Sequence, residues 1–283
     1  MELIESLATR TLSSKTINNY EKTYKAIIKR LGRPIIEAEQ DEIIHAISQV
    51  SENPSTRYTY SNVPMLILKH HNKPFDLIEK SREELDKKRR LHHQDETKTE
   101  IDQLPKLSEM KHYISTLVEK EDYKGFIINY LLLHYGCRLK DLNCKVIDGK
   151  EFHASIPYNT LALYENHVKW TRNDYKTLVN YGSKTHLIRN KDFKFCVKQL
   201  PLGKWLLNGG DEPLGDDSLN KPIKKHTFRN LSEGNIFKMI VADLKDKPNF
   251  DKNLLKYSER RGTDVKTILT AYNNLSTEDV ESE

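Results

Sequence analysis

The spacing of apolar residues constrains this chain more than any other feature, because it follows a helical period almost everywhere. Between Ser14 and Gly32, apolar side chains recur every three or four residues and form a single stripe, and Pro34 stands just beyond the glycine. A serine, such a stripe and a terminal glycine are typical of one capped amphipathic helix. Further helices are predicted near 39–50, after Pro54, and at about 75–90. The first 90 residues are therefore expected to form a wholly helical domain.

A change of composition then predicts a domain boundary. Residues 91–105 carry many charges and few apolar groups, so we expect an exposed linker there. Residues 106–283 are expected to form a second domain. It begins with predicted helices at 108–119 and 122–135 and a shorter one from Leu139. Residues 151–195 alternate instead, with NYGS between them as a turn, which predicts a strand–turn–strand unit. The fold class expected is mainly α with a small β-sheet or hairpin, α+β.

Several classes of protein are disfavoured by what the sequence does not contain. No stretch approaches the roughly 18 apolar residues that a membrane span needs, and the N-terminus lacks the basic and apolar regions of a secretory signal. The three cysteines are not closely paired, which suits reduced thiols in an intracellular protein. No CxxC or HExxH pattern suggests a metal site.

Basic residues gather in two segments. Residues 165–198 carry eight lysines and arginines against three acids, and 221–229 carry four against none. Clustered cations suit a polyanion such as DNA, because neutralised phosphates release counterions. A solvated basic surface would have the same composition, so charge alone leaves both readings open. The candidate DNA contacts in these segments are Lys169, Arg172, Lys224 and Lys225.

Four short segments carry side chains suited to phosphate chemistry. In LLLHYGCRLKDL, Arg138 follows the end of an apolar helix, with Asp141 near enough to orient it. The hairpin segment offers two lysines, each followed by threonine, and either can reach a phosphate or protonate a leaving oxygen. Alone, the arginine would suit a surface salt bridge and the lysines a solvent-facing role. The two lysines are Lys176 and Lys184.

The other two segments lie nearer the C-terminus. His226 and Arg229 stand three apart in HTFRN, a spacing that puts both on one face of a helix and lets them share one phosphate. HxxR occurs often by chance. In RGTDVKTILTAYNN, Tyr272 is predicted on a short helix behind a turn at Gly262, where a lone tyrosine is usually a packing residue.

Taken in order, these segments resemble the tyrosine recombinase, or phage integrase, family. GCRLKDL is similar to the family phrase GLRISEL, YKT to its hairpin lysine phrase, and HTFRN to HxLRH. RGT stands in the place of LGH, and Tyr272 follows Thr263 by nine residues, as the family tyrosine follows its histidine. The resemblance covers most of 104–283, and the helical domain before it fits the family's core-binding domain. The hairpin and the compact size are similar to recombinases of large DNA viruses and their virophage satellites.

The resemblance implies a site-specific recombinase that cleaves and rejoins double-stranded DNA without metal, ATP or any other cofactor. Tyr272 would attack phosphorus and form a 3′-phosphotyrosyl link. The charge on the phosphate would be stabilised by Arg138, Arg229 and His226. Lys176 would protonate the departing 5′-oxygen, with Lys184 as the alternate. The family also implies a homotetramer on DNA from a free monomer or dimer, acting in the nucleus, cytoplasm or viral factory of a host.

Three departures from the family pattern keep other readings open. Thr263 replaces a histidine or tryptophan, Asn230 replaces the second histidine of HxLRH, and the segment between Arg229 and Tyr272 is longer than usual. A type IB topoisomerase-like enzyme would use nearly the same residues. A DNA-binding protein that has lost catalysis on this scaffold is a third reading, and a helical interaction protein unrelated to DNA is a fourth.

Overall fold

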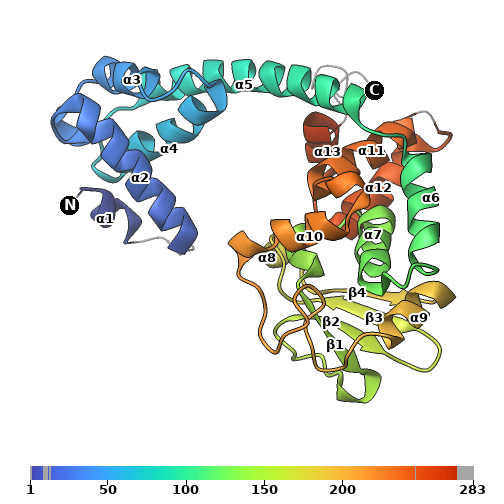
Figure 1. Cartoon of the computed structure of the whole chain (residues 1–283). Helices are drawn as coiled ribbons and strands as arrows, with labels where there is room; N and C mark the ends of the chain where they lie inside the picture. The colour runs from blue at the N-terminus through green and yellow to red at the C-terminus, as the bar shows by residue number, and fades with distance from the viewer. Residues whose placement is uncertain (1, 9–11, 13, 246, 273–283) are drawn as a thin grey trace. The chain divides into compact units, whose positions relative to one another are not determined.

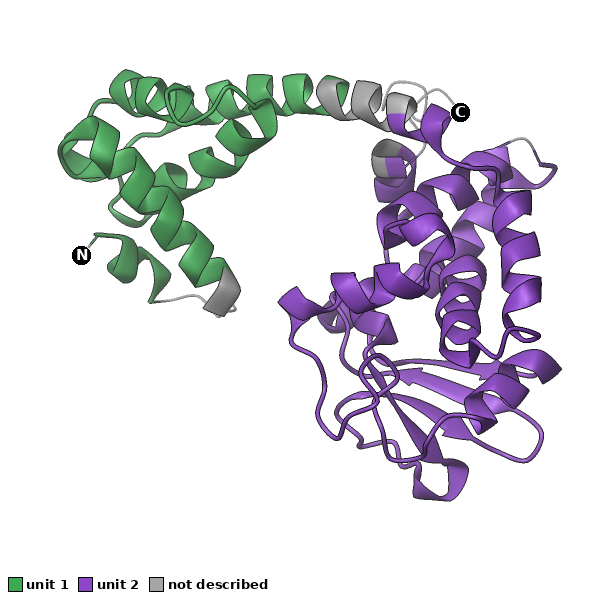
Figure 2. Cartoon of the chain, in the orientation of Figure 1, with its two compact units in different colours: residues 1–96 green, residues 97–283 purple. Residues whose placement is uncertain are grey.

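The chain divides into two compact units, residues 1–96 and 97–283, as the computed structural model shows (Figure 2). The structure describes residues 2–8, 12, 14–245 and 247–272. Each unit has its own cluster of buried hydrophobic residues, as expected of segments that fold around separate cores.

The described part of unit 1 is built from helices alone. These are α1 (Glu2–Leu7), α2 (Ser14–Leu31), the 3-10 turn η1 (Ile35–Glu37), α3 (Gln40–Ser48), α4 (Pro54–His70) and the first part of α5 (Asp76–Gln103). The predicted amphipathic helix is confirmed as α2, and its Ile27 is fully buried beside Ile43 and Ile67. The buried carboxylate of Glu2 accepts hydrogen bonds from the backbone of η1, which fastens the start of the chain to this core.

One helix boundary in this region was predicted wrongly. The helix expected to end near residue 90 continues as α5 to Gln103, so most of the predicted linker 91–105 is helical. Seven of the fifteen residues in 91–105 are leucine, glutamate, glutamine or lysine, which favour a helix through their intrinsic propensity. The division between the two units falls within this helix.

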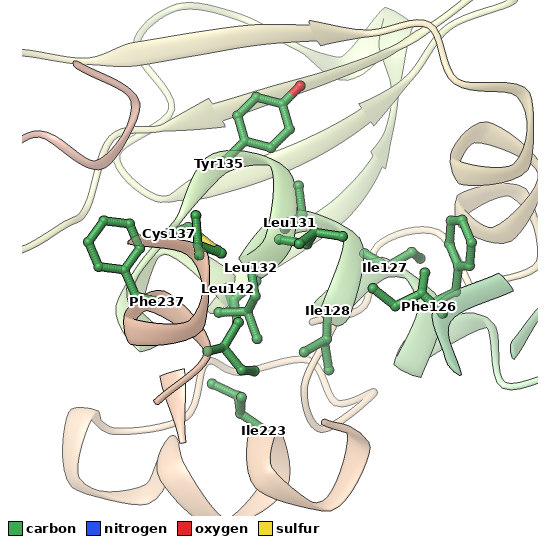
Figure 3. Packing of buried hydrophobic residues seen from close by; sticks show 14 of the residues in the cluster. Phe126, Ile127, Ile128, Leu131, Leu132, Tyr135, Cys137, Leu142, Ile223 and Phe237 are labelled. Atoms are coloured by element: carbon green, nitrogen blue, oxygen red, sulfur yellow. The ribbon is translucent and has the colours of Figure 1, made fainter. Parts of the chain in front are cut away.

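Helix α7 forms the centre of unit 2. It spans Tyr123–Tyr135, and nine of its thirteen residues are buried, including Ile127 and Leu131. Around it pack α6 (Leu107–Leu117), α9 (Lys191–Lys198), α10 (Asn220–His226), α11 (Glu233–Lys245) and α12 (Phe250–Arg261). The close view shows side chains from several of these segments meeting around α7 (Figure 3). A helix that is buried around most of its circumference has no wide solvent-facing stripe, which explains its mainly apolar sequence.

A mixed sheet lies beside these helices (Figure 1). Its strands are β1 (Cys144–Asp148), β2 (Asn159–Leu163), β3 (Val168–Arg172) and β4 (Lys184–Ile188). They are ordered β1-β2-β3-β4, with β1 and β2 parallel and the other neighbours antiparallel. The helix predicted from Leu139 is only a 3-10 turn, η2 (Leu139–Leu142), because the chain enters β1 two residues later. The predicted turn NYGS overlaps the short helix α8 (Leu178–Tyr181) between β3 and β4.

The remaining elements complete a mainly helical unit with one small sheet, which confirms the predicted α+β class. They are η3 (Gly149–Glu151), η4 (Asp216–Ser218), η5 (Phe228–Asn230) and α13 (Val265–Tyr272). Over the described residues, none of the helices combines the length and the apolar composition needed to cross a membrane.

Candidate active site

A glycine turn at the end of α7 places Arg138. Gly136 has a φ of +56°, and a Cβ there would lie 2.5 Å from the ring of Phe237, so both conformation and space require glycine. The chain then turns into η2, where the Asp141 carboxylate accepts the Arg138 backbone N–H at 2.8 Å. The sequence predicted that Asp141 orients Arg138, and it does so through the backbone rather than through the guanidinium.

The carboxylate of Asp141 pairs with a different arginine, Arg172 at the end of β3. The two side chains are fully buried, with Nη1 of Arg172 2.9 Å from Oδ2 of Asp141. Arg172 also donates to the carbonyl of Arg260 near the end of α12. The prediction that Arg172 contacts DNA is therefore wrong, because a side chain with 0% exposure cannot reach a phosphate. Breaking such a pair from one side leaves an uncompensated charge and costs about 3–5 kcal/mol.

A second glycine turn, between α12 and α13, meets the first. Gly262 has a φ of +65°, and a Cβ there would lie 3.0 Å from Oγ1 of Thr177. Thr177 donates to the Gly262 carbonyl at 2.7 Å. Nη1 of Arg138 donates to the carbonyls of Arg261 and Gly262 at 2.8 and 3.4 Å. These bonds join segments that are more than 80 residues apart in sequence.

Tyr272 lies at the end of α13, next to this turn. Its Oη accepts a hydrogen bond from Nη2 of Arg261 at 3.1 Å. Its ring packs edge-on against Phe237, with centroids 4.8 Å apart. Arg138 and Tyr272 are thus both tied to the Arg261–Gly262 turn. Burial and the neighbouring Arg261 lower the pKa of Arg138, although its guanidinium remains the charged form at neutral pH.

The two hairpin lysines have different surroundings. Nζ of Lys184 donates to the carbonyl of Glu259 in α12, and its Cε lies near Gly262. Burial, followed by the nearby charge of Arg172, lowers the pKa of Lys184. Lys176 lies in the turn before α8 and is exposed. The structure therefore brings the alternate lysine, rather than the first choice, to the turn that holds Arg138.

HTFRN does not form the single helix face that its spacing suggested. His226 ends α10, Thr227 is extended, and Arg229 has a φ of +50°, so that interpretation is wrong. Asn129, in the middle of α7, causes the break by binding the chain on both sides of Thr227. Its side-chain amide donates to the His226 carbonyl at 2.7 Å, and its oxygen accepts from the Phe228 N–H at 3.3 Å.

The side chains of HTFRN contact other parts of unit 2. Nδ1 of His226 lies 3.5 Å from Asp122, the residue that caps the start of α7. Arg229 is 59% exposed and pairs with Glu109 at 2.8 Å. Asp122 and Arg138 flank opposite ends of a 13-residue helix, which is roughly 20 Å long at the usual rise per residue. Among the described residues, no hydrogen bond or ion pair links either side chain to Arg138 or Tyr272.

The other predicted site residues are spread over the unit. Thr263 is buried, and its backbone is bonded to Ser258 across the turn. Lys169 holds its Nζ 3.8 Å above the ring of Phe152. In the last turn of α10, Lys225 is exposed and Lys224 is half-buried.

Three residues of this region were missed by the sequence reasoning: Arg261, Asn129 and Thr177. Their roles depend on backbone atoms distant in sequence, and the only hints in the sequence are the arginine of RGT and the asparagine within an apolar helix. No group of His, Cys, Asp and Glu able to hold a metal occurs within the described ranges. The three cysteines are free and buried.

Comparisons with known proteins find little that is close. No family model matches the chain, and no curated protein does. Among solved structures, the crystal structure of XerA recombinase aligns over 99% of this chain and 94% of its own, with 10% identity and a TM-score of 0.37.

Proposed function

We propose that this protein cleaves and rejoins double-stranded DNA through a covalent link to Tyr272. The observation that carries the proposal is the meeting of Tyr272 and Arg138 on one turn, although they are 134 residues apart. The bonds from Arg138 to that turn all leave from Nη1, so its other guanidinium nitrogens remain for a phosphate. A nucleophile, a guanidinium and the lysine Lys184 are the groups that phosphodiester exchange needs.

The proposed reaction conserves the energy of the broken bond. Oη of Tyr272 forms a bond to phosphorus as the bond to the 5′-oxygen breaks. The phenolic proton passes to water, and a hairpin lysine protonates the departing 5′-oxygen. Attack by a 5′-hydroxyl on the phosphotyrosyl link then rejoins the strand. Recombination between two sites would require a homotetramer on DNA, as in the family that the sequence resembles.

A single experiment tests the chemistry. The full chain is incubated with duplexes whose cleaved end diffuses away, and covalent protein–DNA product is sought on a denaturing gel. Trypsin cleavage after Lys266 leaves 267–283, a peptide with one tyrosine, so mass spectrometry identifies the attachment site without ambiguity. We expect the adduct on Tyr272. An adduct on another residue, or none with any duplex, would contradict the proposal.

Tyr272→Phe is the companion variant. It removes one oxygen, so DNA binding should persist while the adduct disappears. Tyr257→Phe is the matched control, because Tyr257 packs against the same Phe237 ring but donates to the Leu133 carbonyl instead. This control should lose about 1 kcal/mol of stability and keep forming the adduct.

A second candidate function is DNA binding without cleavage. The separation of His226 and Arg229 from Tyr272 favours it, because the family resemblance would place all of them on one phosphate. DNA binding with no adduct would support this reading. An adduct together with relaxation of supercoiled plasmid, but no exchange between sites, would support a topoisomerase-like activity.

A further inference from the structure

Arg261, the last residue of α12, is the most enclosed cation in contact with Tyr272. Its exposure is 2%. Nη1 donates to the carbonyl of Gly136 and, at 3.4 Å, to that of Cys137. Nη2 donates to the Glu233 carboxylate and, at 3.1 Å, to Oη of Tyr272. The guanidinium also lies over the Phe237 ring, 4.1 Å from its centroid.

A count of donors limits what Arg261 can do. A guanidinium has five N–H groups, and the four on its terminal nitrogens all have partners within the protein. Only the Nε–H has no hydrogen-bond partner among the described residues, so Arg261 has no fork of two free donors to offer a phosphate. Arg138 differs, because its contacts with the turn use only one terminal nitrogen. The two arginines therefore suit different atoms of the reaction.

We propose that Arg261 is a catalytic residue that acts on the nucleophile, while Arg138 acts on the phosphate. This inference rests on the proposed phosphotyrosyl chemistry. Because Nη2 occupies a lone pair of Oη, the phenolic proton points away from the guanidinium and can leave to water. The fixed positive charge then stabilises the negative charge that develops on Oη as it attacks phosphorus. Arg261 itself neither gains nor loses a proton.

The surroundings of Arg261 keep its charge in place. Burial lowers the pKa of the guanidinium, but Glu233 and Tyr272 outweigh that effect and the net shift is upward. Glu233, at the start of α11, is itself only 15% exposed. Since Gly136 directly precedes the Cys137–Arg138 segment, one side chain ties the nucleophile to the backbone that carries the phosphate-binding arginine.

The family pattern that the sequence resembles assigns no role to the position of Arg261. In the family phrase LGH, the residue before glycine is apolar, whereas this chain has arginine there. Arg229, the arginine that the resemblance selects, is 59% exposed and bonded to Glu109. Arg261 therefore supplies, beside Tyr272, the second guanidinium that HTFRN does not bring there.

The test uses a duplex whose scissile phosphate is a methylphosphonate, which lacks the negative charge. Adduct formation is followed in single-turnover reactions of the full chain. With normal DNA, Arg138→Ala and Arg261→Met should both lose about 100-fold or more in cleavage rate. With methylphosphonate DNA, Arg138→Ala should recover because no phosphate charge needs neutralising. Arg261→Met should stay slow, because its defect lies on Oη.

A double variant guards against simple misfolding. Arg261→Met alone leaves Glu233 buried without its partner, so Arg261→Met/Glu233→Met replaces the whole pair by apolar groups and should fold. It should bind DNA with unchanged affinity and cleave as slowly as the single variant. Arg260→Met is the neighbouring control, since that side chain bonds the His134 carbonyl and not Tyr272. It should cleave at the wild-type rate.

Each outcome decides a different claim. Recovery of Arg261→Met on methylphosphonate DNA, equal to that of Arg138→Ala, would show that Arg261 acts on the phosphate and overturn the inference. A fully active double variant would show that the arginine is structural, which also overturns it while leaving the proposed function intact. Absence of any adduct with the wild-type chain would overturn the proposed function and this inference together.

Discussion

At the scale of single residues, His186 is the group whose ionisation folding changes most clearly. It lies in β4 against the rings of Tyr135 and Trp170. Burial lowers its pKa from 6.5 to about 3, and the positive charges of Arg172, Arg260 and Lys184 act in the same direction. The folded protein therefore holds this imidazole neutral at a pH where the unfolded chain protonates it.

This difference predicts that acid weakens unit 2. As the pH falls below 6.5, His186 binds a proton in the unfolded state but not in the folded state, so the free energy of unfolding should fall. By pH 5 the loss attributable to His186 should be about 2 kcal/mol. Urea unfolding followed by tryptophan fluorescence measures it, since both tryptophans lie in unit 2. His186→Gln should lose less stability over the same pH range, and an unchanged pH dependence in that variant would refute the assignment.

Single residues also show where sequence reasoning reached its limit. Arg138 was identified because a glycine at a helix end announces a turn. Arg172 and Arg261 could not be interpreted in the same way, since each is defined by a carboxylate or carbonyl more than 25 residues away. In sequence, a buried arginine and a DNA-binding arginine look alike. The two kinds of arginine differ only in their burial and in their hydrogen-bond partners. This is why the sequence wrongly predicted a DNA contact for Arg172.

At the scale of elements, local sequence patterns predicted most of the helices. They did not predict where tertiary contacts override a local preference for helix. The stripe of α2 and the apolar run of α7 carry their own signals. The strands β1 and β2 pair in parallel and are therefore not joined by a hairpin turn, so no local pattern predicts that they pair. HTFRN was placed on a helix by spacing alone, whereas a buried asparagine, Asn129, binds its backbone and breaks the helix.

The contacts of the hairpin between β3 and β4 predict which of its two lysines is the general acid. Its contacts favour Lys184, whereas the sequence phrase YKT favoured Lys176. A 5′-bridging phosphorothiolate has a sulfur leaving group that needs no proton, so it should restore cleavage only to a variant that lacks the acid. We expect Lys184→Ala to be slow on normal DNA and restored on this substrate, with Lys176→Ala close to wild type. Restoration of Lys176→Ala instead would return the role to the exposed lysine.

The same lysine predicts an alkaline limit to cleavage. A general acid must be protonated, and the pKa of Lys184 is lowered from its usual 10.5 by burial and then by Arg172, while Glu259 opposes the shift. Cleavage of normal DNA should therefore decline as the pH rises through that lowered pKa. The decline should vanish with the phosphorothiolate substrate, and its persistence there would assign it to another group. Initial adduct rates between pH 7 and pH 10, as a rough working range, measure it.

At the scale of the whole molecule, the division into two units predicts where proteases cut. The boundary lies within α5, and the sequence of 91–105 offers no apolar stripe for packing. A helix whose sequence has no apolar stripe opens more readily than one that is held in a core. Limited proteolysis should therefore cut first in this stretch and leave a resistant C-terminal fragment that begins between residues 92 and 106. First cuts inside unit 2, or a resistant chain of full length, would contradict the prediction.

The distribution of charge over the whole chain predicts how DNA binding depends on salt. If basic side chains neutralise phosphates, the logarithm of the binding constant should fall linearly with the logarithm of salt concentration, by about 0.9 for each phosphate contacted. Lys225, exposed at the end of α10, is a direct test of one such contact, and Lys225→Ala should reduce the slope by about 0.9.

Arg172 provides the contrast, because its charge is fully buried against Asp141. Arg172→Met/Asp141→Leu, which removes both members of the pair, should leave the slope unchanged in an anisotropy titration. A flat salt response of the wild-type chain would exclude DNA as its partner, and a reduced slope in the Arg172 variant would mean that this arginine is not buried when DNA binds.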